Sequence, residues 1–212
     1  MVKIILIRHG FSEYNKLRKY SGQLDVALDE IGKQQAKDTA DFILKRYKVD
    51  AVYSSDLSRA VSTVQPIADT LKLDVIKKKE LREIDVGLWH DLGFEEAREK
   101  FPETAKILDT DHLSVRYDGG ESYKEVMERM LYTLDEILEK HNGKTIAIAS
   151  HNGSIKALFA AMALKGIMPQ REKSFMPNAS ISVFDYDGKN AEFELMGYNG
   201  HLNRSNSETK VV

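Results

Sequence analysis

The sequence contains no cysteine, and its charged residues nearly balance, with 33 acidic against 31 basic side chains. Without cysteine the protein can form no disulfide bond and cannot use a thiol as a nucleophile. The same absence is typical of proteins in a reducing compartment, so a cytoplasmic location is expected. The balanced charge gives no support for a nucleic-acid or membrane surface, and any positive field must therefore be local.

Hydrophobic runs long enough to cross a bilayer are also missing from the sequence. The apolar stretch near the amino terminus is too short for a signal peptide, so no leader is expected. The histidines show no His-Glu-x-x-His pattern or other ligand spacing, so neither a metal site nor a cofactor is expected. No repeat or low-complexity linker divides the chain, and its length suits one α/β domain.

A short apolar strand near the amino terminus leads directly into reactive side chains. Residues 4–7 read Ile-Ile-Leu-Ile, and Arg8, His9 and Gly10 follow. This mostly β-branched run predicts a strand that is buried on both faces, as in a parallel sheet. Ligands of open α/β sheets bind beyond the carboxyl ends of the strands, and glycine lets the backbone approach them closely. Arg8 and His9 therefore stand where a site is expected.

Two later segments repeat the pattern of a short strand that ends in a cation or an imidazole. Residues 145–150 lead into His151, and residues 51–55 lead towards Arg59. Adjacent parallel strands would bring the three ends to one edge of the sheet, where two arginines and two histidines form a pocket for a dianion. The planar fork of arginine matches phosphate oxygens bidentately, so phosphate is the leading candidate ligand.

Hydrophobic periodicity predicts the elements around this edge. Helices are expected at residues 29–47, 58–71 and 154–164, strands at 49–54 and 73–76, and a hairpin at 181–186 and 191–196. Pro66 should kink the second helix. A further helix should follow the capping-box spacing of Ser122 and Glu125 and stop at Gly143. Residues 89–120 show little periodicity, and a stretch of this kind is often a functional lid.

Further pieces of sequence accompany the strand ends in a fixed order along nearly the whole chain. They are Leu6 to Gly10 with Ser12 and Asn15, Gly22 and Gln23 with Asp25, Leu28 and Gly32, Tyr53 to Ala60, Leu81 to Ile84 with Gly87 and Trp89, Gly120 to Ser122 with Arg129, Ser150 and His151, Asn178 to Ser180, and His201 with Leu202. Together they resemble the histidine phosphatase superfamily, in its phosphoglycerate mutase-like branch. The resemblance implies a phosphatase rather than a mutase.

The same resemblance implies an α/β fold of the phosphoglycerate mutase-like type. This fold is a three-layer α/β/α sandwich with a mostly parallel central sheet. Residues 1–212 would form a single histidine-phosphatase domain, with a lid-like insertion at about 89–120 and a flexible tail at about 203–212.

His9 is the expected nucleophile, because a neutral imidazole nitrogen attacks a phosphate dianion without the repulsion that an anion meets. Arg8 and Arg59 should lower its pKa by disfavouring a further positive charge, which keeps His9 neutral near about pH 7. The resemblance implies that His9 becomes a phosphohistidine, which water then hydrolyses. Arg8, Arg59 and His151 would bind the equatorial oxygens of the phosphate in the transition state.

Departure of the alcohol needs a proton, and the resemblance implies Glu83 as the donor. Position alone cannot select Glu83 among the many acidic residues of the chain. A nearby phosphate dianion would favour the protonated carboxyl group, which gives an acid for the leaving group and a base for the later water. The candidate substrate-binding residues are Ser12, Asn15, Gln23 and Asn152.

Two positions depart from the family pattern. Asn152 stands where the family usually has glycine, which puts in question how the backbone after His151 meets the phosphate. Asp91 stands where glycine is common after the Trp89 motif, so the entrance of the lid is expected to differ.

Three functions are compatible with these residues. A cofactor-independent phosphatase acting on a small phosphorylated metabolite is favoured. A bisphosphoglycerate-dependent phosphoglycerate mutase must bind a second acidic group, and family mutases carry an adjacent arginine pair after the catalytic glutamate, whereas Arg98 and Arg116 stand apart. A non-catalytic phospho-ligand binding or regulatory protein would need neither His9 nor Glu83. The substrate and the oligomeric state stay open, with a homodimer as one alternative.

Overall fold

A six-stranded sheet forms the centre of the protein, in the strand order β3-β2-β4-β1-β5-β6. The computed structural model describes residues 1–168 and 176–203, so the tail expected at about 203–212 lies, from residue 204 on, outside the described residues. The strands are β1 (Val2–Arg8), β2 (Ala51–Ser54), β3 (Val75–Lys77), β4 (Thr145–Ser150), β5 (Ile181–Tyr186) and β6 (Ala191–Tyr198). The first four strands named in the sheet order run parallel, and β5 and β6 are antiparallel additions at one edge.

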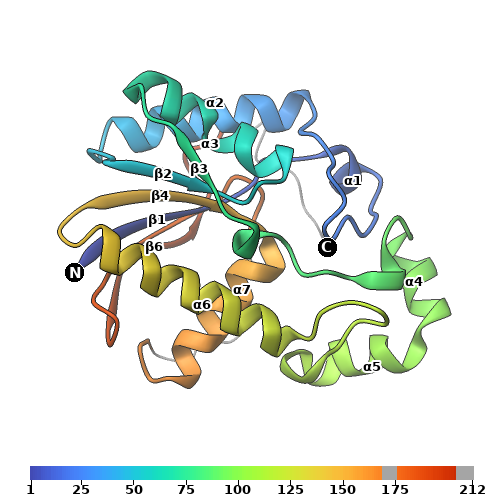
Figure 1. Ribbon diagram of the computed structural model, residues 1–212. Coiled ribbons are helices and arrows are strands. Elements are labelled where there is room, and N and C mark those ends of the chain that lie inside the picture. Colours follow the sequence, from blue (N-terminus) through green and yellow to red (C-terminus); the bar gives the residue numbers. More distant parts are fainter. Residues whose placement is uncertain (169–175, 204–212) are drawn as a thin grey trace.

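Helices cover both faces of this sheet (Figure 1). The α-helices are α1 (Glu13–Lys16), α2 (Glu30–Leu44), α3 (Ser58–Leu71), α4 (Phe94–Lys100), α5 (Pro102–Thr110), α6 (Tyr123–Lys140) and α7 (Asn152–Leu164), and the short 3-10 helices are η1 (Lys79–Leu81), η2 (Gly87–Trp89) and η3 (His112–Ser114). Helices α2 and α3 pack on one face, and α6 and α7 on the other (Figure 1). The expected three-layer sandwich with a mostly parallel sheet is confirmed.

Strand β1 shows why the sequence folds in layers. It lies between β4 and β5, and its apolar residues at positions 4–7 are at most 2% exposed. Successive side chains of a strand point to opposite faces, so Ile5 and Ile7 join the cluster beneath α2 and α3, while Ile4 and Leu6 join the cluster beneath α6 and α7. Each such burial contributes about 1.5–3 kcal/mol.

Most elements lie close to the ranges expected from periodicity. Helix α3 occupies the expected residues 58–71 and contains Pro66 in its interior. Helix α6 begins with the expected capping box, in which the Ser122 hydroxyl accepts from the Glu125 backbone N–H and the Glu125 carboxylate accepts from the Ser122 N–H. The short edge strand lies at Val75–Lys77. It begins two residues later and ends one residue later than the expected range, 73–76.

Residues 89–120 are more regular than the sequence indicates, because they form α4, α5 and η3. Helix α5 begins at Pro102, a residue that is favoured at the first helical position. Trp89 is fully buried here, with its ring stacked on Phe101 at 5.8 Å and edge-on to Tyr117 at 5.2 Å between centroids. The segment thus packs around an aromatic cluster of its own, and its role as a lid stays a proposal.

Candidate active site

The ends of three parallel strands meet at one edge of the sheet, as expected from the sequence. Strand β4 pairs with β1 and with β2, and Arg8 lies opposite Ser150. The backbone N–H of His9 donates to the Ser150 carbonyl at 3.0 Å, which joins the two loops directly after their strands. The rings of His9 and His151 consequently lie 5.1 Å apart between centroids.

The ring of His9 is held in the form that a nucleophile needs. Its Nδ1 lies 2.7 Å from the Gly10 carbonyl oxygen, which can only accept, so Nδ1 carries the hydrogen and Nε2 keeps a lone pair. The side chain is 4% exposed. Burial lowers the pKa of His9 well below 6.5, and the charges of Arg59 and Arg8 lower it further. The expected effect of the arginines is present, but burial has the larger effect.

His151 is held in the opposite tautomer. The Arg59 Nε–H donates to His151 Nδ1 at 3.2 Å, so the ring hydrogen must sit on Nε2. His151 Nε2 is buried and has no hydrogen-bond partner within the described part of the chain. Burial, followed by Arg59 and His9, lowers the pKa of His151 well below 6.5, so the ring is neutral. It therefore presents one N–H donor suited to a phosphate oxygen.

Arg59 is fully buried at the start of α3, and part of its fork is already occupied. Its Nη1 donates to the Leu24 carbonyl and its Nη2 to the Gly22 carbonyl, both at 2.7 Å. One N–H on each terminal nitrogen remains for another acceptor. The side chain thus positions His151 and the loop before Asp25, and direct phosphate binding by Arg59 stays a prediction.

Arg8 supplies a second donor beside His9. Its Nη1 donates to the Met176 carbonyl, and its Nε is buried without a hydrogen-bond partner among the described residues. Burial lowers the pKa of Arg8 to about 10, while the carboxylate of Glu83 opposes this shift, so the guanidinium stays charged at neutral pH. A buried unsatisfied donor is costly, and an anion bound between Arg8 and His151 would satisfy both donors.

The Glu83 side chain lies beside the same helix end that carries His151. The backbone N–H groups of Gly153 and Ser154 donate to its two carboxylate oxygens, each at 3.0 Å. A side chain at position 153 would collide with this carboxylate, because an added Cβ would lie 2.6 Å from Glu83 Oε1. The role of Gly153 and Ser154 could not be predicted from the sequence, because every residue type except proline offers the same backbone N–H donor.

The weaker substrate-binding candidates mostly make contacts within the protein. The Ser12 hydroxyl caps α1 by accepting from the Asn15 backbone N–H, and the Asn15 side-chain oxygen accepts from the Ser12 N–H. Gln23 donates from Nε2 to the Glu83 carbonyl at 3.2 Å, and its Oε1 accepts from Arg82. Gln23 is thus placed beside Glu83. Substrate contacts by these three residues stay predictions.

Asn178, one of the residues that carry the family resemblance, connects two loops of the site. Its side-chain Nδ2 lies within hydrogen-bond distance of three oxygens, namely the His9 carbonyl at 3.2 Å, the Gly10 carbonyl at 3.3 Å and Asn15 Oδ1 at 3.0 Å. Asn178 is 1% exposed. It therefore ties the loop of His9 and Gly10 to α1.

The two departures from the family pattern are accommodated differently. Asp91 adopts a φ of 65°, the left-handed region that glycine enters most easily and aspartate tolerates. Its carboxylate accepts from Lys19 Nζ at 2.8 Å and from the Tyr14 hydroxyl at 2.9 Å. Asn152 begins α7, and its Oδ1 is buried without a partner in the described ranges. Its contact with substrate stays a prediction.

Among the described residues, no group of three or more His, Cys, Asp or Glu side chains lies in an arrangement that could hold a metal ion. Within the same residues, no helix is both long enough and apolar enough to cross a membrane.

The two buried histidines should make the folded protein sensitive to acid. Their lowered pKa means that, below about pH 6.5, the unfolded chain binds protons that the folded state does not bind. The free energy of unfolding should therefore decrease as the pH is lowered below about 6.5, by about 1.4 kcal/mol per pH unit for each histidine. We expect His9→Gln to remove one such contribution, measured by urea unfolding between about pH 8 and 5.5.

The upper part of that pH range serves as the control. Above about pH 7.5 the imidazole is neutral in both the folded and the unfolded state. Plots of the free energy of unfolding against pH should therefore run parallel for the wild type and the variant in that range. Identical slopes below about pH 6 would show that His9 titrates normally in the folded protein.

Comparisons with known proteins agree with this arrangement. Residues 4–199 match the histidine phosphatase superfamily (branch 1). Phosphoserine phosphatase 1 of Hydrogenobacter thermophilus is 36% identical over 203 residues, which cover 95% of each chain. Phosphoglycerate mutase-like protein 4 of Arabidopsis thaliana is 34% identical, over 94% of this chain and 86% of that protein.

A solved structure shows the same fold. Phosphoserine phosphatase from Entamoeba histolytica, in complex with 3-phosphoglyceric acid, superposes with a TM-score of 0.81 at 28% identity. The match covers 96% of this chain and 100% of that one. Because the family match spans nearly the whole chain and the sequence relatives exceed 30% identity, this chain belongs to the histidine phosphatase superfamily, branch 1.

Proposed function

We propose that this protein hydrolyses small phosphomonoesters through a phosphohistidine at His9, with Glu83 as proton donor. The observation that carries the proposal is the pair of opposite tautomers. His9 Nδ1 is occupied by the Gly10 carbonyl, so Nε2 is the nucleophile, while His151 Nε2 is a donor in reach of the same ligand. The hydrolase class is confirmed by relatives that are themselves named phosphatases.

The reaction takes place in two displacements on phosphorus. In the first, His9 Nε2 forms a bond to phosphorus while the ester P–O bond breaks, and the Glu83 carboxyl group gives its proton to the departing oxygen. In the second, water attacks phosphorus, the P–N bond breaks, and the Glu83 carboxylate takes a proton from that water. Arg8 and His151 stabilise the charge on the equatorial oxygens in both steps.

A mutase would need further cations for a second acidic group. The two arginines in the segment between Glu83 and α6, Arg98 and Arg116, are instead paired with carboxylates. Arg98 binds Asp109 through two bonds of 2.7 and 2.8 Å, and Arg116 binds Glu125 at 2.7 Å. This pairing supports hydrolysis over phosphoryl transfer to a second substrate.

A purely regulatory phosphate-binding protein is the alternative of another class. Binding a phosphate would need donors such as Arg8 and His151, but it would not need an imidazole lone pair aimed at phosphorus or a carboxyl group beside it. The ordering of both His9 and Glu83 by backbone contacts supports catalysis.

The comparisons also suggest a substrate class. One relative is named phosphoserine phosphatase, and one solved neighbour is in complex with 3-phosphoglyceric acid. Phosphoserine and 3-phosphoglyceric acid are both small alkyl phosphomonoesters, and we propose a substrate of this class. A cytoplasmic location and a homodimer stay proposals, the second of which a sedimentation measurement would check.

A panel of phosphomonoesters tests the proposed function. We expect release of inorganic phosphate from phosphoserine and similar esters without added bisphosphoglycerate, and with undiminished rate after exhaustive chelation. Dependence on bisphosphoglycerate, with conversion of one phosphoglycerate into another, would establish the mutase instead. Loss of activity on chelation and recovery with a divalent ion would contradict the metal-independent mechanism.

A further inference from the structure

The chain that carries Glu83 has no regular structure of its own. It runs between η1, which ends at Leu81, and η2, which begins at Gly87. Its backbone carbonyl groups therefore cannot be satisfied by a sheet or a helix, and they need partners from elsewhere in the fold. The carbonyl groups of Arg82 and Glu83 accept from Ser154 and Gln23, respectively, and both also accept from one further side chain.

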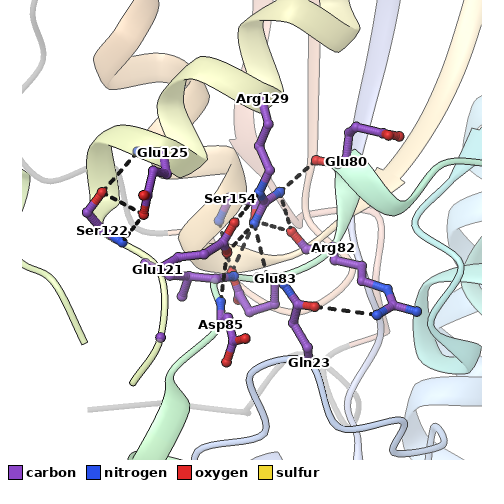
Figure 2. Close-up of polar contacts among 12 residues, drawn as sticks. Gln23, Glu80, Arg82, Glu83, Asp85, Glu121, Ser122, Glu125, Arg129 and Ser154 are labelled. Atoms are coloured by element: carbon purple, nitrogen blue, oxygen red, sulfur yellow. Dashed lines mark hydrogen bonds and ion pairs between the residues drawn. The ribbon is translucent and has the colours of Figure 1, made fainter. Parts of the chain in front are cut away.

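That side chain is Arg129, which reaches down from α6 (Figure 2). Nη1 donates to the Glu80 carbonyl at 2.6 Å and to the Arg82 carbonyl at 2.8 Å. Nη2 donates to the Glu83 carbonyl at 3.1 Å. One guanidinium thus binds three carbonyl oxygens within four residues of chain, and one of these belongs to Glu83 itself.

Glu121 completes the arrangement from the other side. Its carboxylate accepts from Arg129 Nε at 2.8 Å and from Nη2 at 2.9 Å. The same carboxylate accepts from the Asp85 N–H at 2.8 Å, and the Glu121 N–H donates to the Asp85 carbonyl at 2.9 Å. The arginine and the glutamate together hold the chain on both sides of Glu83 (Figure 2).

All five N–H groups of the Arg129 guanidinium are used in these five bonds. None is left for a phosphate oxygen or for any other substrate group. The Arg129 side chain is 17% exposed and that of Glu121 is 23% exposed, so water screens the pair only partly. Apart from its positive charge, which contributes to lowering the pKa of His151, Arg129 can therefore influence the reaction only through the residues that it holds.

We propose that Arg129 is a positioning residue for proton transfer. Together with Glu121 it fixes residues 80–85, so that the Glu83 carboxyl group meets the leaving oxygen at hydrogen-bond distance. The inference rests on the proposed function of Glu83 as the acid. General acid catalysis depends on this distance, and a displacement of about 1 Å costs about a hundredfold in rate.

Arginine is needed here because of its shape. Lysine keeps the positive charge, but its three donors radiate from one atom and cannot span carbonyl oxygens of Glu80, Arg82 and Glu83 together with a carboxylate. Arg129→Lys should therefore retain the ion pair with Glu121 and most of the fold, while it loses the bonds to the Glu83 chain. It serves as the milder variant beside Arg129→Met, which removes every bond.

The test compares an alkyl phosphate with an aryl phosphate, because only the alkoxide leaving group depends strongly on the acid. We expect Arg129→Met to slow turnover of the alkyl ester by about a hundredfold and that of the aryl ester far less. Arg129→Lys should show the same selectivity with a smaller loss. In a Glu83→Gln background, Arg129→Met should cost almost nothing further, because the group that it positions is already gone.

Arg116→Met is the matched control. Arg116 also pairs with a glutamate at the start of α6, but it donates to the Gly120 carbonyl and the Glu125 carboxylate and not to the Glu83 chain. It should leave both rates unchanged. Equal losses on both esters in Arg129→Lys, or full additivity with Glu83→Gln, would overturn the positioning role alone. If Glu83→Gln itself showed no preference between the esters, the acid role of Glu83 would fall, and the role of Arg129 with it.

Discussion

Replacement of His9 by alanine should abolish turnover while the protein stays folded. The loss should reach at least about ten-thousandfold, since removal of a covalent nucleophile typically costs that much or more. No other group can take its place, because the second imidazole in the site, His151, has its lone pair occupied by Arg59. The measurement is the release of inorganic phosphate by the purified variant.

The fold should survive because the backbone of His9, not its side chain, joins the loops. Its N–H donates to the Ser150 carbonyl, and its carbonyl accepts from the Ala179 N–H at 3.1 Å. Circular dichroism and thermal unfolding should therefore resemble those of the wild type. His141→Ala is the control, because His141 precedes β4 and lies at the opposite end of the sheet. Retained activity in His9→Ala would remove His9 as the nucleophile.

Glu83→Gln should slow the hydrolysis of alkyl phosphates far more than that of aryl phosphates. An alkoxide cannot leave readily without a proton, whereas a phenolate can. General acid catalysis is typically worth about a hundredfold to ten-thousandfold, and the alkyl ester should lose roughly that much. With the aryl ester a phosphoenzyme should accumulate, because the same residue is missing when water must be activated.

The structure also narrows the alternatives to Glu83. Both oxygens of the Glu121 carboxylate bind Arg129, and one also accepts from the Asp85 N–H, so Glu121 is occupied in holding the Glu83 chain. Asp85 accepts from the Gly87 N–H at 2.9 Å and is the next candidate. Asp85→Asn is therefore the control variant for the comparison of the two esters. Equal losses on both esters in Glu83→Gln would move the acid role to Asp85.

The strand ends could be predicted from the sequence because they depend on local patterns. A buried β-branched run that stops at Arg8 or Ser150 marks a parallel strand, and parallel strands share the edge at which they end. Once β4 lies between β1 and β2, the placement of His9 and His151 follows. The family resemblance added Glu83, which no local pattern distinguishes from other acidic residues.

The surroundings of these side chains could not be predicted, because they join segments that are distant in sequence. The bond from Arg129 to the Glu83 carbonyl spans 46 positions, and that from Gly153 to the Glu83 carboxylate spans 70. Backbone groups provide one or both atoms of such bonds, and they are the same in every residue type. Arg59 is a second example. Its guanidinium group is of the type that binds phosphate, but its position in the fold directs two of its donors to the carbonyl groups of Gly22 and Leu24.

Trapping the phosphoenzyme tests the central claim most directly. Glu83→Gln is mixed with an aryl phosphate, quenched within one turnover in alkali, in which phosphohistidine survives, and digested for mass spectrometry. We predict one phosphate on the peptide that contains His9, formed together with a burst of phenol, and none in the variant that also carries His9→Ala. Phosphate on another residue would contradict the mechanism. It would also be contradicted if phenol and inorganic phosphate were released at equal rates without a burst and no phosphorylated peptide were found.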